Sequence, residues 1–448
     1  MFKHIKDIKN DAIWLVPGLR VKRWFGLIIF GAVLSAIGAA FLFRLEPLYY
    51  FVAKAKELVH VVPAELVGIV FIVGGAVLFL QGWQRTNYSM LSADESRSRR
   101  AVGETLYRRM KLNHGPKIVA IGGGTGLSTI LRGIKKLTNN VTAIVTVGDD
   151  GGSSGRLREE MGILPPGDIR NCIAALADDD DIVTKLFQYR FKTGEGLEGH
   201  SFGNLFITAL SSICGDMISA IKESSRVLLI RGRVLPSTTD DMRLIAKMED
   251  GSIVKGESNI PEAGKKIIEL SSDPELCKPA QDIIEAIREA ELIILGPGSL
   301  YTSIIPNLLV KDLALEIEKS KAKKIYACNI MTQPGETDNY SVSDHIKAIF
   351  KHANARGVKK NLFDAVMVNN FIPRNLSQKY EEADSLPVEL DTGEVKKLGV
   401  EIVSAKLVHD DKDGLVRHSP MRLAKAVYRW YKNKPVTSCE KPLVESVK

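Results

Sequence analysis

The stretch Lys117–Ser128, with the sequence KIVAIGGGTGLS, decides how the central part of this chain folds. Its apolar run ends abruptly in glycines at 122, 123, 124 and 126, and an amphipathic run from 127 to 137 follows. This order is typical of a buried parallel strand, a tight turn and the first turns of a helix. Glycines let a ligand approach the backbone closely, and a helix start offers free N–H groups and the positive end of a dipole. The turn therefore predicts an anion site, most often for phosphate.

The glycine turn fits neither of two well-known phosphate motifs. A Walker A loop needs a lysine after its last glycine, and none follows Gly126. A dinucleotide-binding G-x-G-x-x-G would need glycine where Leu127 stands. The alternative is a tight turn without a ligand, but three consecutive glycines exceed what a turn needs. On this view Gly124→Val blocks the ligand and leaves the fold largely intact. The residues expected to hold phosphate are Gly122, Gly123, Gly124, Thr125 and Gly126.

The composition is that of a globular protein with an unusual basic start. Of 448 residues, 45% are hydrophobic and 25% are charged, and the formal net charge is +8. Lys and Arg crowd into the first quarter beside hydrophobic segments, which indicates a membrane surface rather than nucleic acid. The five cysteines are scattered and form no C-x-x-C pair, so neither a disulfide framework nor a zinc site is indicated.

Two segments, 24–43 and 61–83, are long and apolar enough to cross a bilayer. Two buried core helices would be the alternative. Lys and Arg crowd before the first segment and after the second, which by the positive-inside rule places both termini and the main domain in the cytoplasm. We therefore predict a two-span anchor in the cell membrane over 1–87. A basic juxtamembrane linker over 88–115 would lie against anionic lipids.

From residue 116 the sequence alternates between strand and helix patterns. This spacing predicts an α/β fold with a doubly wound, mostly parallel sheet over 116–433. A strand-rich or mixed insert is expected around 227–234 and 252–255, and 434–448 is expected to be a loose tail. Further strands are predicted at 141–147, 292–295, 324–329, 362–368 and 399–408, and helices at 278–290, 309–320, 343–354 and 421–431.

Small polar residues follow almost every predicted strand. Ligands of doubly wound sheets bind outside the carboxyl ends of the strands, so these residues describe a cleft for a large polar ligand. The candidates at strand ends are Asp149, Asp150, Gly152, Ser153, Arg156, Gly298, Ser299 and Asn329.

Individual roles follow from side-chain chemistry. Arg156 and Arg170 could contact phosphate. Asp149 and Asp150 could bind ribose hydroxyls or hold Mg²⁺, or could simply form an Asx turn.

Two further segments begin predicted helices. Asp168 follows two prolines near a helix start, where it could bind ligand or act as a cap. His200 could be a general acid or base, although a structural hydrogen bond is the commoner use of a lone histidine. Asn204 suits substrate recognition through its amide.

Taken together, five segments resemble one family. They are 121–127, 147–156, 166–170, 199–204 and 296–302, and the resemblance covers about residues 116–433. The family is the gluconeogenesis-factor proteins, a branch of the 2-phospho-L-lactate transferase superfamily.

The resemblance implies a Rossmann-like domain. It also implies a nucleotide-sugar ligand, UDP-N-acetylglucosamine or UDP-glucose, and a role that links carbon metabolism to peptidoglycan synthesis and cell shape. By the same likeness, Tyr380 and Arg417 fall where contacts to the nucleotide sugar are expected.

Two functions of different classes follow. The first is a membrane-anchored regulator that binds a UDP-sugar without turnover and acts on cell-wall synthesis proteins. The second is a Mg²⁺-dependent transferase that moves a group from a nucleotide-activated substrate, with Asp149, Asp150 and Asp168 as metal ligands. An NAD-dependent oxidoreductase comes third, because the glycine pattern is incomplete. No nucleic-acid motif is present, and homo-oligomer formation stays open.

Overall fold

The computed structural model describes residues 110–177, 182–280, 282–371, 385–408 and 416–435, with a few helical positions between 29 and 77. The chain divides into two units, Met1–Lys111 and Leu112–Lys448. In the part of the chain that the structure describes, no helix is long and apolar enough to cross a membrane. The predicted spans at 24–43 and 61–83 lie almost entirely outside the described residues, as do nearly all of the linker and the tail.

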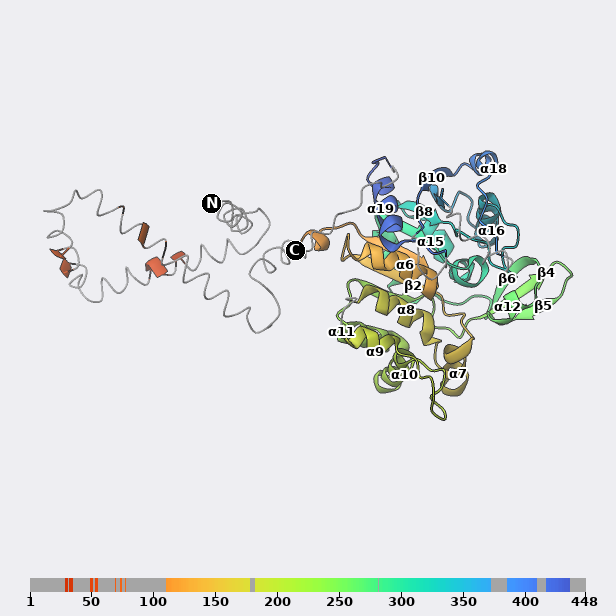
Figure 1. The fold of residues 1–448 in the computed structure, drawn as a ribbon, viewed down its shortest axis with the longest axis horizontal. Helices are drawn as coiled ribbons and strands as arrows, with labels where there is room; N and C mark the ends of the chain where they lie inside the picture. Colours follow the sequence, from red (N-terminus) through yellow and green to blue (C-terminus); the bar gives the residue numbers. More distant parts are fainter. Residues whose placement is uncertain are drawn as a thin grey trace. The chain divides into compact units, whose positions relative to one another are not determined.

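The second unit is built on a sheet of seven parallel strands in the order β10-β9-β8-β7-β1-β2-β3 (Figure 1). Every residue of β1 and β2 is buried, as expected where helices cover both faces of a parallel sheet. The doubly wound α/β fold is therefore confirmed. The strands are β1 (Ile118–Gly122), β2 (Val141–Val145), β3 (Arg233–Pro236), β7 (Leu292–Leu295), β8 (Lys323–Ala327), β9 (Ala365–Asn369) and β10 (Glu401–Ala405).

Helices connect these parallel strands. The first, α6, packs against both α8 and α19, which joins the start of the unit to its end. Helices of the second unit include α6 (Gly124–Ile134), α7 (Gly152–Met161), α8 (Pro166–Leu176), α13 (Ile283–Glu289), the π-helix η2 (Leu300–Ile304), α14 (Ile305–Leu309), α15 (Leu313–Lys319), α16 (Val342–Ala355), α18 (Thr392–Lys397) and α19 (Pro420–Tyr431).

The chain between β2 and β7 departs most from the predictions. The first part of the strand-rich or mixed insert expected around 227–234 and 252–255 is not part of the insert. The helix α11 (Met217–Val227) continues to residue 227. The strand that follows, β3, pairs with β2 and so belongs to the main sheet. Two more helices precede α11. The first, α9 (Ile182–Gln188), was not predicted, whereas α10 (Phe202–Cys214) begins within the segment 199–204, where a helix start was expected.

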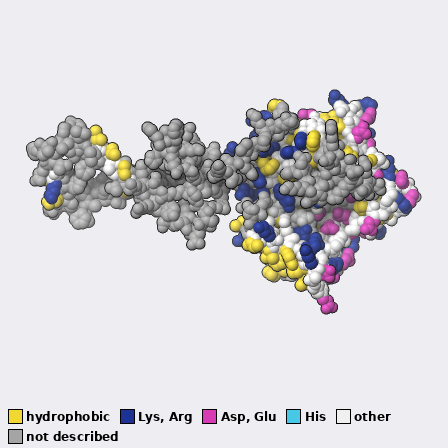
Figure 2. All heavy atoms as spheres, in the orientation of Figure 1, with side chains coloured by type: hydrophobic (Ala, Val, Ile, Leu, Met, Phe, Trp, Pro, Cys, Tyr) yellow, Lys and Arg dark blue, Asp and Glu magenta, His cyan; other side chains and the backbone are white. Residues whose placement is uncertain are grey.

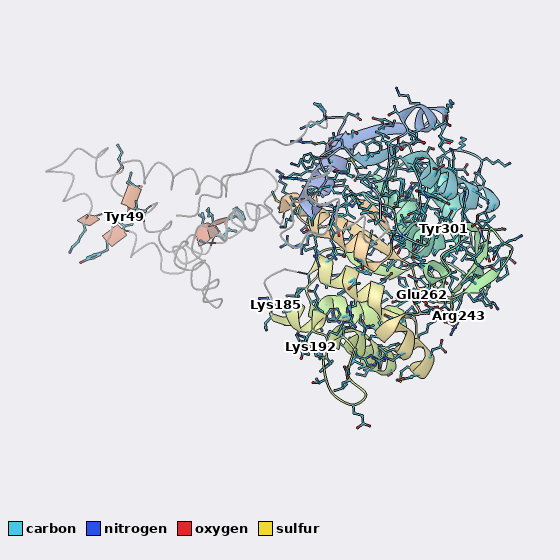
Figure 3. The ribbon with its side chains drawn as sticks, turned by 45° about the vertical axis from the view of Figure 1, so that its right-hand side comes forward. Tyr49, Lys185, Lys192, Arg243, Glu262 and Tyr301 are labelled. Carbon is cyan, nitrogen blue, oxygen red and sulfur yellow. The ribbon has the colours of Figure 1, made fainter. Side chains whose placement is uncertain are left out.

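The strand-rich insert forms a small antiparallel sheet in the order β5-β4-β6. Its strands are β4 (Arg243–Met248), β5 (Ile253–Lys255) and β6 (Ile267–Asp273), and the short helix α12 (Asn259–Glu262) follows β5. In Figure 3, Arg243 and Glu262 mark this insert, whereas Lys185 and Lys192 mark the helical segment around α9.

That helical segment carries several exposed apolar side chains. Figure 2 shows hydrophobic side chains on the side of the unit where α9 and α11 lie. Contiguous apolar surface of this kind is typical of contact sites. The exposed apolar side chains of this segment include Ile182, Leu186, Tyr189, Val227 and Leu229.

Candidate functional site

The carboxyl ends of β1, β2, β7 and β8 form one edge of the main sheet, which we call the carboxyl edge. The strand order reverses at β1. From β1 the chain continues to β2 and β3 on one side, whereas β7 to β10 lie on the other side. Such a topological switch point is where doubly wound sheets bind ligands. The loops after β1 and β7 meet there backbone to backbone, since a Cβ on Gly126 would lie 2.6 Å from the Cα of Gly298.

The glycines after β1 are required by packing. A Cβ on Gly124 would lie 2.6 Å from the Cα of Asp168, and one on Gly123 would lie 2.8 Å from the Cβ of Ser303. The Gly124 N–H donates to the Asp168 carboxylate, so a side chain from α8 meets the start of α6. The expectation that Gly124→Val leaves the fold intact is therefore wrong. Phosphate binding by this turn stays a prediction, and the exposed Thr125 is its most accessible member.

Carboxylates gather beside this turn. Burial, with a contribution from the nearby Asp149, raises the pKa of Asp168 to about 7. Burial likewise raises the pKa of Glu257 well above its usual value, and Asp168, Asp149, Glu336 and Asp150 add repulsion. The Glu257 Oε2 atom is buried without a hydrogen-bond partner among the described residues.

The two adjacent aspartates contact different elements. Asp149 Oδ1 accepts from the Gly151 N–H at 2.9 Å, whereas Asp150 Oδ1 accepts from the Ser258 N–H at 2.9 Å. Each therefore keeps one oxygen for another partner. Within the described part of the chain, no set of three or more His, Cys, Asp or Glu side chains is arranged to hold a metal ion by itself. Mg²⁺, however, commonly takes only one or two protein carboxylates and completes its shell with water and substrate phosphate.

A buried polar network joins the start of α7 to the start of α10. Ser153 Oγ and His200 Nδ1 share a hydrogen bond of 2.9 Å, and Asn204 Nδ2 donates to Ser153 Oγ at 3.0 Å. Burial lowers the pKa of His200, and the positive charge of Arg156 lowers it further. The structure thus brings together Ser153 of the segment 147–156 with His200 and Asn204 of the segment 199–204.

A cavity of about 780 Å³ opens beside this network. Arg156 is exposed there, and its Nη2 donates to the Glu198 carbonyl at 2.7 Å. The start of α7 has no side-chain cap, so its first N–H groups are not met by a capping side chain. The cavity is lined by Asp150, Gly152, Ser153, Gly155, Arg156, Glu159, Glu160, Arg190, Glu198 and Gly199.

Arg170 supports the same region without lining this cavity. It donates to Ser201 Oγ and, at 2.7 Å, to Asn171 Oδ1, so it fixes the start of α10 against α8. Its predicted contact with phosphate stays untested.

The loops after β7 and β8 are linked by amide side chains. The Gly298 N–H donates to Asn329 Oδ1 at 3.3 Å, and Asn329 Nδ2 donates to Gln333 Oε1 at 3.2 Å. Gln333 Nε2 in turn donates to Ser299 Oγ at 2.7 Å. Three predicted site residues therefore lie in one network. Arg417 is exposed in the segment before α19, while Tyr380 lies outside the described residues.

Sequence reasoning assigned no individual role to four residues of this edge, although two of them lie in the strand-end segment 329–336. Arg158 is buried, donates to Asp241 Oδ1 at 2.7 Å and to the Met242 carbonyl at 2.7 Å, and so ties α7 to the segment before β4. Glu336 is buried after β8, and burial raises its pKa to about 7. Glu257 and Gln333 complete the set. The motif GETDN around Glu336 was visible in sequence, but a carboxylate brought in by the insert, such as Glu257, left no signal.

Two tyrosine side chains pack together near the carboxyl edge. Tyr301, labelled in Figure 3, follows β7, and its hydroxyl lies 2.8 Å from that of Tyr340. Its backbone N–H donates to Glu336 at 3.3 Å, which ties the buried carboxylate to the loop after β7.

Comparisons with known proteins agree with this geometry. The family model for the 2-phospho-L-lactate transferase CofD matches residues 118–408. The gluconeogenesis factor of Bacillus subtilis (strain 168) is 49% identical over 310 residues, which cover 69% of this chain and 96% of that protein. A Nostoc sp. relative is 49% identical over 423 residues, which cover 93% of this chain and 92% of its own. A match of that extent includes most of the first unit.

A solved structure shows the same fold. The crystal structure of a Bacillus halodurans protein aligns with a TM-score of 0.67 at 46% identity, and covers 70% of this chain and 99% of that chain. That protein therefore consists almost entirely of a unit like Leu112–Lys448, which folds there without an N-terminal extension. The chain belongs to the 2-phospho-L-lactate transferase CofD family and, within it, to the gluconeogenesis factors.

Proposed function

We propose that the carboxyl edge binds a nucleotide sugar, UDP-N-acetylglucosamine or UDP-glucose, and that the protein acts as a regulator without turnover. One observation carries the proposal, namely the cavity of about 780 Å³ where the uncapped start of α7 meets Arg156 and Arg190. Helix N–H groups and guanidinium groups are the donors that diphosphates prefer. Cavities of this size suit small-molecule ligands.

The regulatory role concerns growth on gluconeogenic carbon sources. In this proposal the bound UDP-sugar reports the supply of cell-wall precursors, and the protein acts on peptidoglycan synthesis and cell shape. The name of the Bacillus subtilis relative supports the link to gluconeogenesis. We further propose that the two apolar segments of the first unit anchor the chain in the cell membrane with the second unit in the cytoplasm.

The binding test uses calorimetric titration of residues 112–448 with UDP-N-acetylglucosamine, UDP-glucose and UDP. Arg156→Met should weaken binding at least about tenfold, because one charge-assisted hydrogen bond contributes about 1.5–3 kcal/mol. Arg132→Met is the matched control, since Arg132 is exposed on the last turn of α6. Absence of binding by the unsubstituted protein at millimolar ligand would reject the proposal.

A transferase is the second candidate, and the buried carboxylates favour it. Asp149, Asp150 and Asp168 would hold Mg²⁺, and the unpartnered Glu257 Oε2 marks a place where a cation would relieve repulsion. When bound, the ion would neutralise charge on the diphosphate. The carboxylates would position the metal ion. The raised pKa of Asp168 predicts that binding of the ion releases a proton from this carboxyl group.

Turnover distinguishes the two candidates. Incubation with a nucleotide-activated substrate and Mg²⁺ should release free nucleotide only if the protein is a transferase. Asp150→Asn keeps an oxygen for the Ser258 N–H but removes the charge, so it should abolish such release. Tight UDP-sugar binding with no release supports the regulator.

A further inference from the structure

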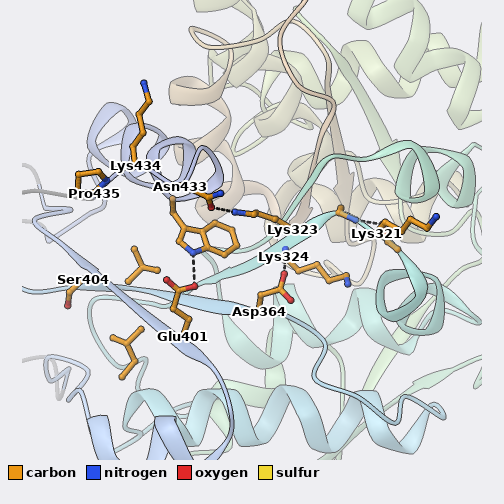
Figure 4. Close-up of a pocket in the computed structure, with 14 residues that line it drawn as sticks. Lys321, Lys323, Lys324, Asp364, Glu401, Ser404, Asn433, Lys434 and Pro435 are labelled. Atoms are coloured by element: carbon orange, nitrogen blue, oxygen red, sulfur yellow. Dashed lines mark hydrogen bonds between the residues drawn. The ribbon is translucent and has the colours of Figure 1, made fainter.

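The opposite edge of the main sheet, where the strands begin, carries a second cavity of about 850 Å³. We call this edge the amino edge. Lys321 and Lys323 precede and begin β8, and Lys432 and Lys434 follow α19. Figure 4 shows Lys321, Lys323 and Lys434 around this cavity, with Lys321 and Lys434 directed away from it. These four side chains, the amino-edge lysines, come from segments more than a hundred residues apart.

Two carboxylates of the amino edge accept hydrogen bonds from aromatic side chains. Glu401 accepts from Trp430 Nε1 at 3.0 Å, a bond drawn in Figure 4, and Glu291 accepts from the Tyr431 hydroxyl at 2.9 Å. Among the described residues, none of the amino-edge lysines lies within ion-pair distance of a carboxylate. These lysine charges are therefore not held in close ion pairs and are available to an anionic surface, although Asp364 and Glu401 line the same cavity.

Aromatic rings lie directly beside these lysines. Lys323 Nζ is 5.3 Å from the Trp430 ring centroid, and Lys432 Nζ is 4.8 Å from that of Tyr431. Trp430 is nearly buried, whereas Tyr431 is partly exposed. An exposed lysine beside a partly exposed tyrosine is a combination typical of side chains at a membrane–water interface.

The chain also enters the second unit at this edge. The Asn139 N–H donates to the Leu112 carbonyl at 2.9 Å, and the Lys117 N–H donates to Glu291 at 3.0 Å, just before β1. Leu112, the first residue of the second unit, therefore lies at the amino edge. The proposed membrane spans precede it in the chain, so a tether to the membrane would begin here.

From this combination we infer that the amino edge docks on an anionic lipid surface, with the amino-edge lysines facing the head groups. Dispersed lysines that point outward suit a fluid array of charges better than one small anion, which would need donors that converge. The inference rests on the membrane localisation proposed above. It does not depend on the UDP-sugar, because that ligand would lie at the opposite edge.

The test uses residues 112–448, a unit that folds alone in the crystallised relative. This protein is sedimented with vesicles of phosphatidylcholine mixed with phosphatidylserine, and with vesicles of phosphatidylcholine alone. We expect partition into the anionic vesicles only, and loss of binding as salt is raised. Lys321→Glu combined with Lys434→Glu should lower the partition coefficient at least about tenfold, and the two glutamine substitutions should lower it less.

The matched control reverses the same number of charges elsewhere. Lys247→Glu combined with Lys266→Glu alters exposed lysines of the small sheet and should leave partition unchanged. Circular dichroism checks that each variant is folded. Equal partition of both double variants would overturn the inference, as would equal binding to neutral vesicles. No vesicle binding by the unsubstituted unit would also overturn it and would favour an acidic protein as the partner of this edge.

Discussion

At the residue scale, Asp168 links the glycine turn to the carboxylates of the site. Its position in sequence suggested a helix cap or a ligand-binding residue. The structure adds that its carboxylate meets the Gly124 N–H of a different helix, and that burial beside Asp149 raises its pKa to about 7. That relation depends on the packing of α6 against α8, so no local pattern could have predicted it.

The pKa of Asp168 predicts a pH dependence of stability. The unfolded chain loses this proton near pH 3.8 and the folded chain near 7, so between these values the folded state binds more protons. The free energy of unfolding should therefore fall as pH rises through this window. Asp168→Asn in residues 112–448 should remove that part of the slope, so its melting temperature relative to the unsubstituted protein should rise between pH 5 and pH 8.

The control for this experiment is Glu262→Gln, a change at an exposed site on the short helix α12. It should leave the pH dependence of the melting temperature unchanged. An unaltered slope in Asp168→Asn would show that the carboxylate is already ionised in the folded protein at low pH. Calorimetric scans at several pH values provide the measurement.

At the element scale, the turn after β1 shows why similar glycines differ. A Cβ on Gly122 would lie 3.6 Å from the Cβ of Leu127, which is ordinary contact, whereas one on Gly124 would lie 2.6 Å from the Asp168 Cα. Gly124→Ala should therefore lower the free energy of unfolding by about 1–3 kcal/mol as an overpacked site, and Gly122→Ala by less than about 1 kcal/mol. Urea unfolding of both variants measures the difference, and equal losses would contradict it.

The parallel strands were predictable because each is a short apolar run buried on both faces. β7 was predicted with its observed bounds, while the helix expected at 278–290 begins only at Ile283. Near the start of the predicted helix, Pro279 instead forms an isolated β-bridge with Thr238. The helices α9 and α11 were missed, whereas the start of α10 was expected from the segment 199–204. Tertiary contacts set these boundaries, and they leave little trace in periodicity.

At the scale of the whole molecule, the strand ends were the most informative part of the sequence. The rule that ligands lie at the carboxyl ends of parallel strands brought Asn329, Gly298 and Ser299 together in prediction, and a single amide network joins them. The roles of Arg158 and Glu257 could not be predicted from the sequence. The segment between β3 and β7 supplies the hydrogen-bond partners of Arg158, and it also supplies Glu257 itself.

The two apolar segments predict how the full chain behaves in cells. We expect the complete protein to stay in the membrane pellet after extraction with alkaline carbonate and to be released by detergent. The protein without its first 111 residues should be released by carbonate, because peripheral contacts with lipid are electrostatic. Release of the complete protein by carbonate would show that the segments do not span the bilayer.

All seven strands of the main sheet point the same way, and this gives the unit a front and a back. Both ends of its described chain, Leu112 and the residues after α19, are held at the back through Asn139, Lys323 and Glu291. A fluorescent reporter fused ahead of Leu112 or behind α19 would therefore leave the front loops unobstructed. The same unit could be built into a biosensor, with its recognition face clear of both fusion joints.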